Sequence, residues 1–241
     1  MAERFRREPN GGGTAVRREQ EEHVVTASPA AQDPTAGALA REVIYAGPPA
    51  ATTADPGPLG LAAFAMTTFV LSMFNAGLLA KGGEPVVLGL AVAYGGVAQI
   101  LAGMWEFRTG NTFGATAFTS FGAFWISFFV IDQFLAKSIP AADAGHAIGL
   151  FLIAWGIFTT YMFVASLRTT AAIATVFLLL AATYFVLGIG AAGAHSTITK
   201  VGGWLGLATA AAAWYASFAV VVNSTFKRTV LPVRPLLREG V

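Results

Sequence analysis

The chain has 241 residues, of which 55% are hydrophobic and only 12% are charged, and its formal net charge is +2. A soluble domain carries about 25% charged residues, so this composition excludes an ordinary water-exposed shell. The sequence contains no cysteine, which excludes disulfides, thiolate metal sites and cysteine nucleophiles.

The first segment, residues 1–54, mixes arginine with glutamate and then becomes rich in alanine, proline and threonine. This composition predicts a disordered cytoplasmic tail. The tail has no apolar run of the length that a secretory signal needs, and acidic residues balance its arginines. We therefore expect neither a cleaved signal nor a lipid-binding basic segment.

Six apolar runs follow the tail. About 20 apolar residues coiled as a helix match the ~30 Å thickness of the hydrocarbon core, and a helix satisfies its own backbone amides in lipid. The pattern predicts an all-α membrane protein with a six-helix transmembrane domain over 55–226, followed by a short basic cytoplasmic tail over 227–241. The predicted spans are 59–80, 86–104, 113–135, 147–166, 170–190 and 201–222.

The positions of lysine and arginine between the runs predict the orientation, because cytoplasmic loops carry the excess of positive charge. With both termini in the cytoplasm, Arg108, Arg168 and the basic residues after the sixth run lie inside. Three lysines are then left outside, namely Lys81, Lys137 and Lys200. An even number of spans agrees with this arrangement.

Small residues recur at helical spacing on two of the predicted helices and indicate faces where backbones approach closely. The second helix carries Gly89, Ala93, Gly96 and Gly103, and the sixth carries Gly202, Gly206 and Ala210. We interpret these faces as packing sites. Trp105, Trp204 and Trp214 are interpreted as interfacial or packing aromatics.

Polar residues inside the spans are the first candidates for function, because their burial in lipid is costly. On the first helix Phe64, Thr68, Leu71 and Asn75 lie at i, i+4, i+7 and i+11, so they share one face that can line a pore. Further neutral hydrogen-bonding groups come from the next three helices: Tyr94, Gln99, Thr116, Thr119, Thr159 and Thr160. The alternative, that these side chains only join neighbouring helices, stays open.

The third helix is preceded by Gly110, where Asn111 or Thr112 can cap the first turn. A helix N-terminus attracts anions, so a carboxylate can rest there, although capping alone explains these residues equally well. Glu106 and Arg108, just before this turn, are interpreted as a cytoplasmic surface pair.

Two other classes of function find less support. An enzyme needs convergent catalytic side chains, but the three histidines, His23, His146 and His195, fall in the tail and in two predicted outer loops. A retinal-type receptor needs a lysine at mid-membrane depth, whereas Lys200 lies at a helix boundary. We expect no catalytic residue, no metal, no cofactor and no nucleic-acid partner.

Several blocks of the sequence resemble the acetate uptake transporter family, which includes the bacterial succinate–acetate permeases and their fungal relatives. The resemblance begins with Asp-Pro-Gly-Pro-Leu-Gly-Leu-Ala-Ala-Phe at 55–64 and extends to about residue 233. It continues in family order through the blocks at 67–69, 75–77, 94–100, 110–114, 117–120, 155–159 and 228–232. Asp55, Gly57 and Ala63 depart from the family pattern.

The resemblance implies a homohexamer in a bacterial-type plasma (inner) membrane, with a six-helix pore in each protomer. It implies a narrow hydrophobic gate at Phe64, Phe121 and Leu180, where Phe121 replaces the tyrosine of the family. The expected substrate is acetate or a similar small monocarboxylate, with succinate as a further candidate. Passive anion conduction and proton-coupled symport both stay open. We predict the substrate path along Thr68, Asn75, Tyr94, Gln99, Asn111 and Thr112.

Overall fold

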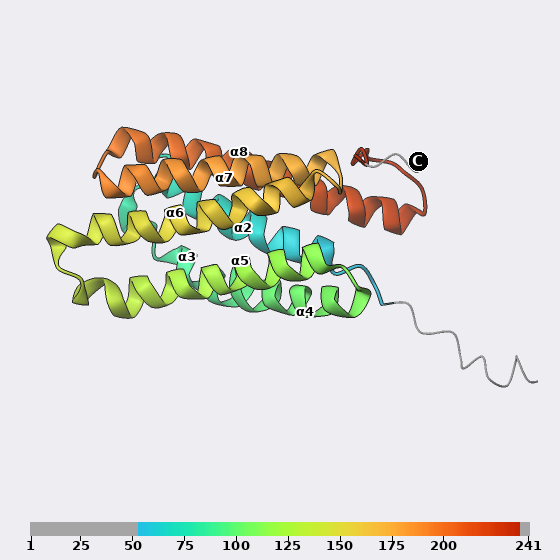
Figure 1. Ribbon diagram of the computed structural model, residues 1–241, viewed down its shortest axis with the longest axis horizontal. Coiled ribbons are helices and arrows are strands. Elements are labelled where there is room, and N and C mark those ends of the chain that lie inside the picture. Colours follow the sequence, from blue (N-terminus) through green and yellow to red (C-terminus); the bar gives the residue numbers. More distant parts are fainter. Residues whose placement is uncertain (1–52, 237–241) are drawn as a thin grey trace, which may run out of the picture. The chain divides into compact units, whose positions relative to one another are not determined.

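The computed structural model describes residues 53–236 and contains six helices that are long and apolar enough to cross a membrane (Figure 1). The prediction of an all-α membrane protein is confirmed. The predicted disorder of residues 1–54 concerns a segment that lies almost wholly outside the described range. The elements are α2 (Gly57–Asn75), η2 (Lys81–Gly83), α3 (Val86–Val92), η3 (Ala93–Ala98), α4 (Gln99–Thr109), α5 (Thr112–Val130), η4 (Ile131–Leu135), η5 (Ala136–Ser138), α6 (Ala141–Ser166), α7 (Ala171–Ala192) and α8 (Ser196–Phe226).

The second span is not a uniform helix. It begins as α3, passes through a π-helical turn in η3 and continues as α4. In a π turn the backbone bonds reach one residue further than in an α-helix, so the turn accommodates an extra residue. Gly95 lies in this turn against the side chain of Thr67 on α2, where a β-carbon would be only 2.6 Å from the threonine Oγ1.

Several helix ends differ from the predicted ones. α2 ends at Asn75 rather than at residue 80, because Gly77 turns the chain with a φ of 76°. α6 begins after Pro140 rather than at residue 147, and α8 covers Ser196–Phe226 rather than 201–222. Hydropathy marks only the part of a helix inside the hydrocarbon, whereas polar turns extend the same helix into the interface.

The most extensive packing joins α6 to α7, α7 to α8, α2 to α8 and α4 to α5 (Figure 1). The predicted small-residue face of α8 is packed: Gly202 meets Leu187, Gly206 meets Ser72 and Ala210 is fully buried. On the second span Gly103 packs against Thr119, but Gly89 has open space around it. The small-residue face of this span is therefore shorter than predicted.

The loop after α4 is fixed by a glycine and a cap. Gly110 has a φ of 78°, a conformation that favours glycine, and lets the chain leave α4. Asn111 then accepts a hydrogen bond from the Gly114 backbone N–H at 3.0 Å. This is the N-cap that the sequence offered as one of two choices.

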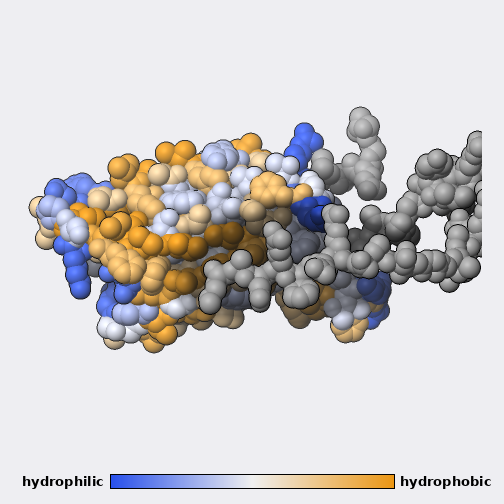
Figure 2. Space-filling view, turned by 90° about the horizontal axis from the view of Figure 1, so that it is seen from below, coloured by the Kyte–Doolittle hydropathy of each residue, from blue (hydrophilic) through white to orange (hydrophobic). Residues whose placement is uncertain are grey.

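Apolar side chains dominate the middle of the face in Figure 2, and polar residues gather toward the two ends. Large apolar residues are exposed on every membrane-length helix, for example Leu101, Leu150 and Leu178. In water such a surface would be costly, whereas acyl chains solvate it without penalty. The outer surface thus agrees with a bundle immersed in lipid.

Replacing Gly203 by alanine is expected to destabilise the protein. A β-carbon at this position of α8 would overlap the backbone where α2 ends, at Asn75 and Ala76. Overpacking of this kind costs about 1–3 kcal/mol, so the thermal unfolding temperature in detergent should fall. Gly89→Ala is the matched control, because nothing lies near a β-carbon there. Equal unfolding temperatures for the two variants would contradict the packing argument.

Candidate functional site

A cavity with a volume of about 360 Å³ lies between α2, α5, α6 and α7. Its wall is mostly apolar and aromatic. The polar residues that reach it lie along α2 and α7 and at the end near η2, and they are Thr68, Ser72, Asn75, Glu84, Asp132, Thr183, Tyr184 and Thr199. Thr68 and Asn75 thus line this cavity together with Phe64 and Leu71 of the same helix, and their contact with substrate stays a prediction.

A second, smaller cavity of about 20 Å³ lies between α2, α4, α5 and α7. Gln99 is its polar lining residue, and the rest of the wall is apolar. Phe64 and Leu180 belong to the walls of both cavities. These two side chains therefore stand at the boundary between the two spaces.

Phe121 lies beside Phe64 at this boundary, with ring centroids 5.8 Å apart. Its ring centroid is also 5.4 Å from that of Phe158 and 6.0 Å from that of Phe177. Phe64, Phe121 and Leu180 are each at most 4% exposed. We call the region around these three side chains the neck. Its walls offer no hydrogen bond, so water and ions that enter it lose their hydration.

Buried threonines in this bundle usually bond to their own helix. Thr67 donates to the Ala63 carbonyl at 2.9 Å, Thr159 to Trp155 at 2.7 Å and Thr183 to Leu179 at 2.8 Å. Thr159 and Thr160, which the sequence offered as pore groups or packing groups, both make such bonds. The hydroxyl of Thr68 differs, because it is buried in the cavity wall without a protein partner.

Four further buried polar atoms have no protein partner: both amide atoms of Gln99, the indole Nε1 of Trp125 and the hydroxyl of Thr119, which lies against Gly103 and lines neither cavity. Gln99 is 1% exposed and lines the smaller cavity, and Trp125 is 2% exposed and lines the larger one. A buried polar group without a partner costs free energy unless a ligand or water satisfies it. The wall of each cavity thus includes a buried polar side chain without a protein partner.

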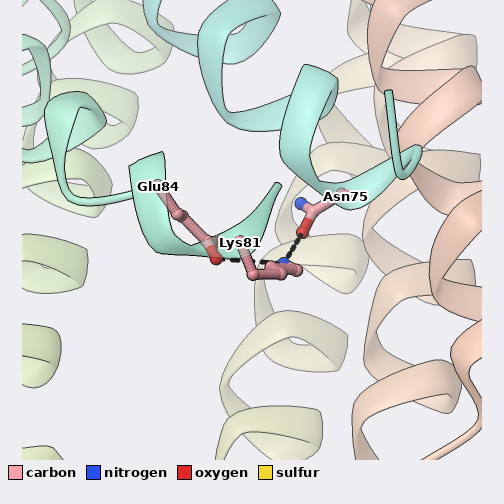
Figure 3. Close-up of polar contacts among 3 residues, drawn as sticks. All are labelled: Asn75, Lys81 and Glu84. Carbon is pink, nitrogen blue, oxygen red and sulfur yellow. Dashed lines mark hydrogen bonds and ion pairs between the residues drawn. The ribbon is translucent and has the colours of Figure 1, made fainter. Parts of the chain in front are cut away.

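The end of the larger cavity is organised by a lysine. Lys81 donates to the Asn75 Oδ1 at 3.1 Å and to the Glu84 Oε2 at 3.0 Å (Figure 3). The second contact is also an ion pair. Asn75 and Glu84 both line the cavity, and Lys81 sits behind them in η2.

Three of the predicted path residues line neither cavity. Tyr94 lies half-buried in the π turn η3, and Asn111 and Thr112 are exposed at the start of α5. Asn111 uses its amide to cap α5 and to donate to the Glu106 Oε2 at 2.9 Å. The structure therefore gives Asn111 local partners, and its contact with substrate stays a prediction.

The interpretation of Glu106 and Arg108 as a surface pair is wrong. Glu106 is only 2% exposed and accepts hydrogen bonds from Asn111 and from the Thr109 hydroxyl at 3.2 Å. Arg108 forms no ion pair with it among the described residues. The helix turns Glu106 toward Gly57 and Gly114, whose missing side chains leave room for the carboxylate.

Several residues of the cavity wall were not predicted, including two aromatic residues that carry a polar group. Trp125 and Tyr184 are aromatic residues with a polar tip, and each lies in the middle of its span rather than at a boundary. The Tyr184 ring stacks on Phe121, with centroids 6.5 Å apart. Their mid-span position is the signal that would have identified them, because such aromatics normally gather at the bilayer interfaces.

The described part of the chain holds no group of three or more histidine, aspartate or glutamate side chains placed to bind a metal ion. Besides the carboxylates of Glu84 and Asp132 at one end of the larger cavity, the two cavities offer neutral hydrogen bonding from hydroxyl, amide and indole groups. Such groups can orient a small carboxylate or carboxylic acid without forming a buried ion pair.

Replacing Gln99 by methionine, which has nearly the same shape, should stabilise the protein. The change removes two buried polar atoms that lack partners, and such atoms cost about 1–3 kcal/mol. Thermal unfolding in detergent without added carboxylate checks this. Gln133→Met is the control, because Gln133 is exposed and bonds only to Asp132. A lower unfolding temperature for Gln99→Met than for the control would show that the amide is already satisfied.

Comparison with known proteins places this architecture in a family. A profile of the GPR1/FUN34/yaaH family matches residues 36–238. The chain is 42% identical to acetate permease A of Emericella nidulans over 195 residues, which cover 75% of this chain and 65% of the permease. It is 41% identical to the succinate-acetate/proton symporter SatP of Escherichia coli (strain K12) over 182 residues, which cover 75% of this chain and 95% of SatP.

The solved structure of the bacterial acetate channel SatP is similar to the structure described above. The TM-score is 0.71 and the sequence identity 38%, over 76% of this chain and 99% of the SatP chain. The profile match covers most of the sequence, and the relatives share about two residues in five with it. The chain belongs to the GPR1/FUN34/yaaH family.

Proposed function

We propose that this chain forms a path across the membrane for small carboxylates, with the monocarboxylate acetate first and the dicarboxylate succinate as a further candidate. The observation that carries the proposal is the pair of cavities that meet at Phe64 and Leu180. A path interrupted by one apolar constriction is the arrangement expected for a selective pore. The names of the relatives, an acetate permease and a succinate-acetate symporter, support the same class of substrate.

The neck sets the size and charge of what passes. A hydrated inorganic ion would have to shed its water between Phe64, Phe121 and Leu180, where nothing replaces it. A small monocarboxylate has a methyl group that suits the aromatic wall and a polar end that the unpartnered donors can bind. Thr68 and Trp125 receive that end on one side of the neck, and Gln99 receives it on the other.

Phe121 has no hydroxyl to offer at the neck. Tyr184 stacks on Phe121 and lines the larger cavity, so it brings a phenol to the edge of the same constriction. A carboxylate that approaches from this side therefore meets a donor on α7 in place of one on α5.

Proton-coupled symport is the second candidate mechanism, and the relatives' names include both a symporter and a channel. The remaining parts of the proposal are a homohexamer of six-helix pores, a bacterial-type plasma membrane location and two cytoplasmic termini, with tails at 1–54 and 227–241. The distribution of lysine and arginine between the spans supports the orientation. An enzymatic role has no support in the chemistry of the cavities.

Purified protein in proteoliposomes should take up labelled acetate faster than empty vesicles do. An imposed voltage without a pH gradient, and a pH gradient without a voltage, separate the two mechanisms. A passive anion channel responds to the voltage, whereas a symporter responds to the pH gradient. Uptake no higher than that of empty vesicles at several pH values would contradict transport altogether.

Phe64→Ala should widen the neck and weaken size selection. The change removes the ring that separates the two cavities, so propionate and larger acids should gain flux relative to acetate by about tenfold, the factor that 1.4 kcal/mol of lost discrimination represents. Competition between labelled acetate and unlabelled acids measures the effect. Phe107→Ala is the control, because Phe107 is exposed on the outside of α4. An unchanged ranking of acids would contradict the gating role of Phe64.

A further inference from the structure

Lys81 forms a hydrogen bond with Asn75, which lines the larger cavity of the proposed substrate path. Its ammonium donates to the Asn75 Oδ1 at 3.1 Å, and the same group pairs with the Glu84 Oε2 at 3.0 Å (Figure 3). The short helix η2 holds Lys81 in place, since the Glu84 backbone N–H donates to the Lys81 carbonyl. The lysine is thus fixed between a neutral amide and a carboxylate.

The contact with Lys81 decides which way the Asn75 amide faces. An ammonium can only donate hydrogen bonds, so it can pair only with the oxygen of the amide. The Nδ2 of Asn75 is left without an acceptor among the described residues, in a side chain that lines the larger cavity. Lys81 therefore turns Asn75 into a donor for an arriving carboxylate.

The charges around this end of the cavity make the lysine more important. Glu84 and Asp132 both line the cavity, and each would repel an anion. Lys81 forms the single ion pair found within residues 53–236, and it neutralises Glu84. Lys200, another lysine near this end, lies against Gly77. Without Lys81 the entrance would present two carboxylates to a carboxylate substrate.

We infer that Lys81 is a positioning residue for carboxylate capture: it orients the Asn75 amide toward the cavity and offsets the acidic entrance. This inference rests on the proposed function. It assigns Lys81 to substrate binding rather than to passage through the neck. Loss of the lysine should therefore raise the KM for acetate and leave the maximal flux nearly unchanged.

The test measures KM and maximal flux for labelled acetate in proteoliposomes. Lys81→Met should raise KM about three- to tenfold, as expected when a charge-assisted hydrogen bond is lost. Lys81→Arg keeps the charge and the donors, so it should restore KM to within about twofold. Lys137→Met is the control for a general loss of positive charge, because Lys137 lies at the same end, in η5, and touches neither Asn75 nor Glu84.

A double-mutant cycle separates orientation of the amide from simple attraction of anions. If Lys81 acts partly through Asn75, the double variant with Lys81→Met and Asn75→Ala should raise KM by less than the product of the two single effects, because only the charge offset at Glu84 is independent of Asn75. Additive effects, or an equal rise in KM for Lys137→Met, would overturn the inference. So would a KM for Lys81→Met within about twofold of the wild type.

Two outcomes keep this inference distinct from the proposed function. Normal acetate flux with an unchanged KM in Lys81→Met overturns the inference alone, whereas no wild-type flux overturns both. If Lys81→Met does not fold, Glu84→Gln decides, because it removes a charge that repels the substrate and that competes with Asn75 for the Lys81 ammonium. A lower KM for Glu84→Gln supports the inference, and an unchanged KM overturns it.

Discussion

The absence of water from the bilayer core is the constraint on which the rest of this structure depends. Every backbone amide in the core must find its partner within its own segment, so the spans are helices. Most backbone N–H and C=O groups are therefore already bonded to each other. Selectivity must then come from side chains. Threonines such as Thr67 and Thr183 donate their hydroxyls to carbonyls of their own helix, so these hydroxyls already have a partner. The few polar atoms left over are therefore the ones that can meet a substrate.

The remaining atoms that belong to cavity walls lie on the two sides of the aromatic neck. Thr68 and Trp125 lie on one side and Gln99 on the other, while Phe64 and Leu180 separate them. Each cavity offers neutral donors, and neither wall of the neck offers any. Neutral donors suit a guest that must leave as readily as it enters, because a buried lysine or arginine would hold a carboxylate too firmly. At the acidic end of the larger cavity, Lys81 forms an ion pair with Glu84.

The sequence was sufficient for the number and type of the helices, since hydropathy and length report directly on a lipid environment. It was less reliable for their ends, because an apolar run measures the hydrocarbon rather than the helix, as α6 and α8 illustrate. The helical spacing of Phe64, Thr68 and Asn75 correctly indicated one shared face. Trp125 and Tyr184 were missed, since the depth of an aromatic residue depends on packing between helices. Glu106 was assigned to the surface because its room is made by distant glycines, which no local pattern reveals.

The π turn of η3 changes how the second span responds to a change in its length. Ala93–Ala98 accommodates one residue more than a regular α-helical turn would. Loss of one residue from this turn would let the helix become regular, and Gln99 and the rest of α4 would keep their facing. Loss of a residue from a regular stretch such as α4 would instead rotate everything after it by about 100°. The π turn is consequently a part of this span where evolution can change the chain length at little structural cost.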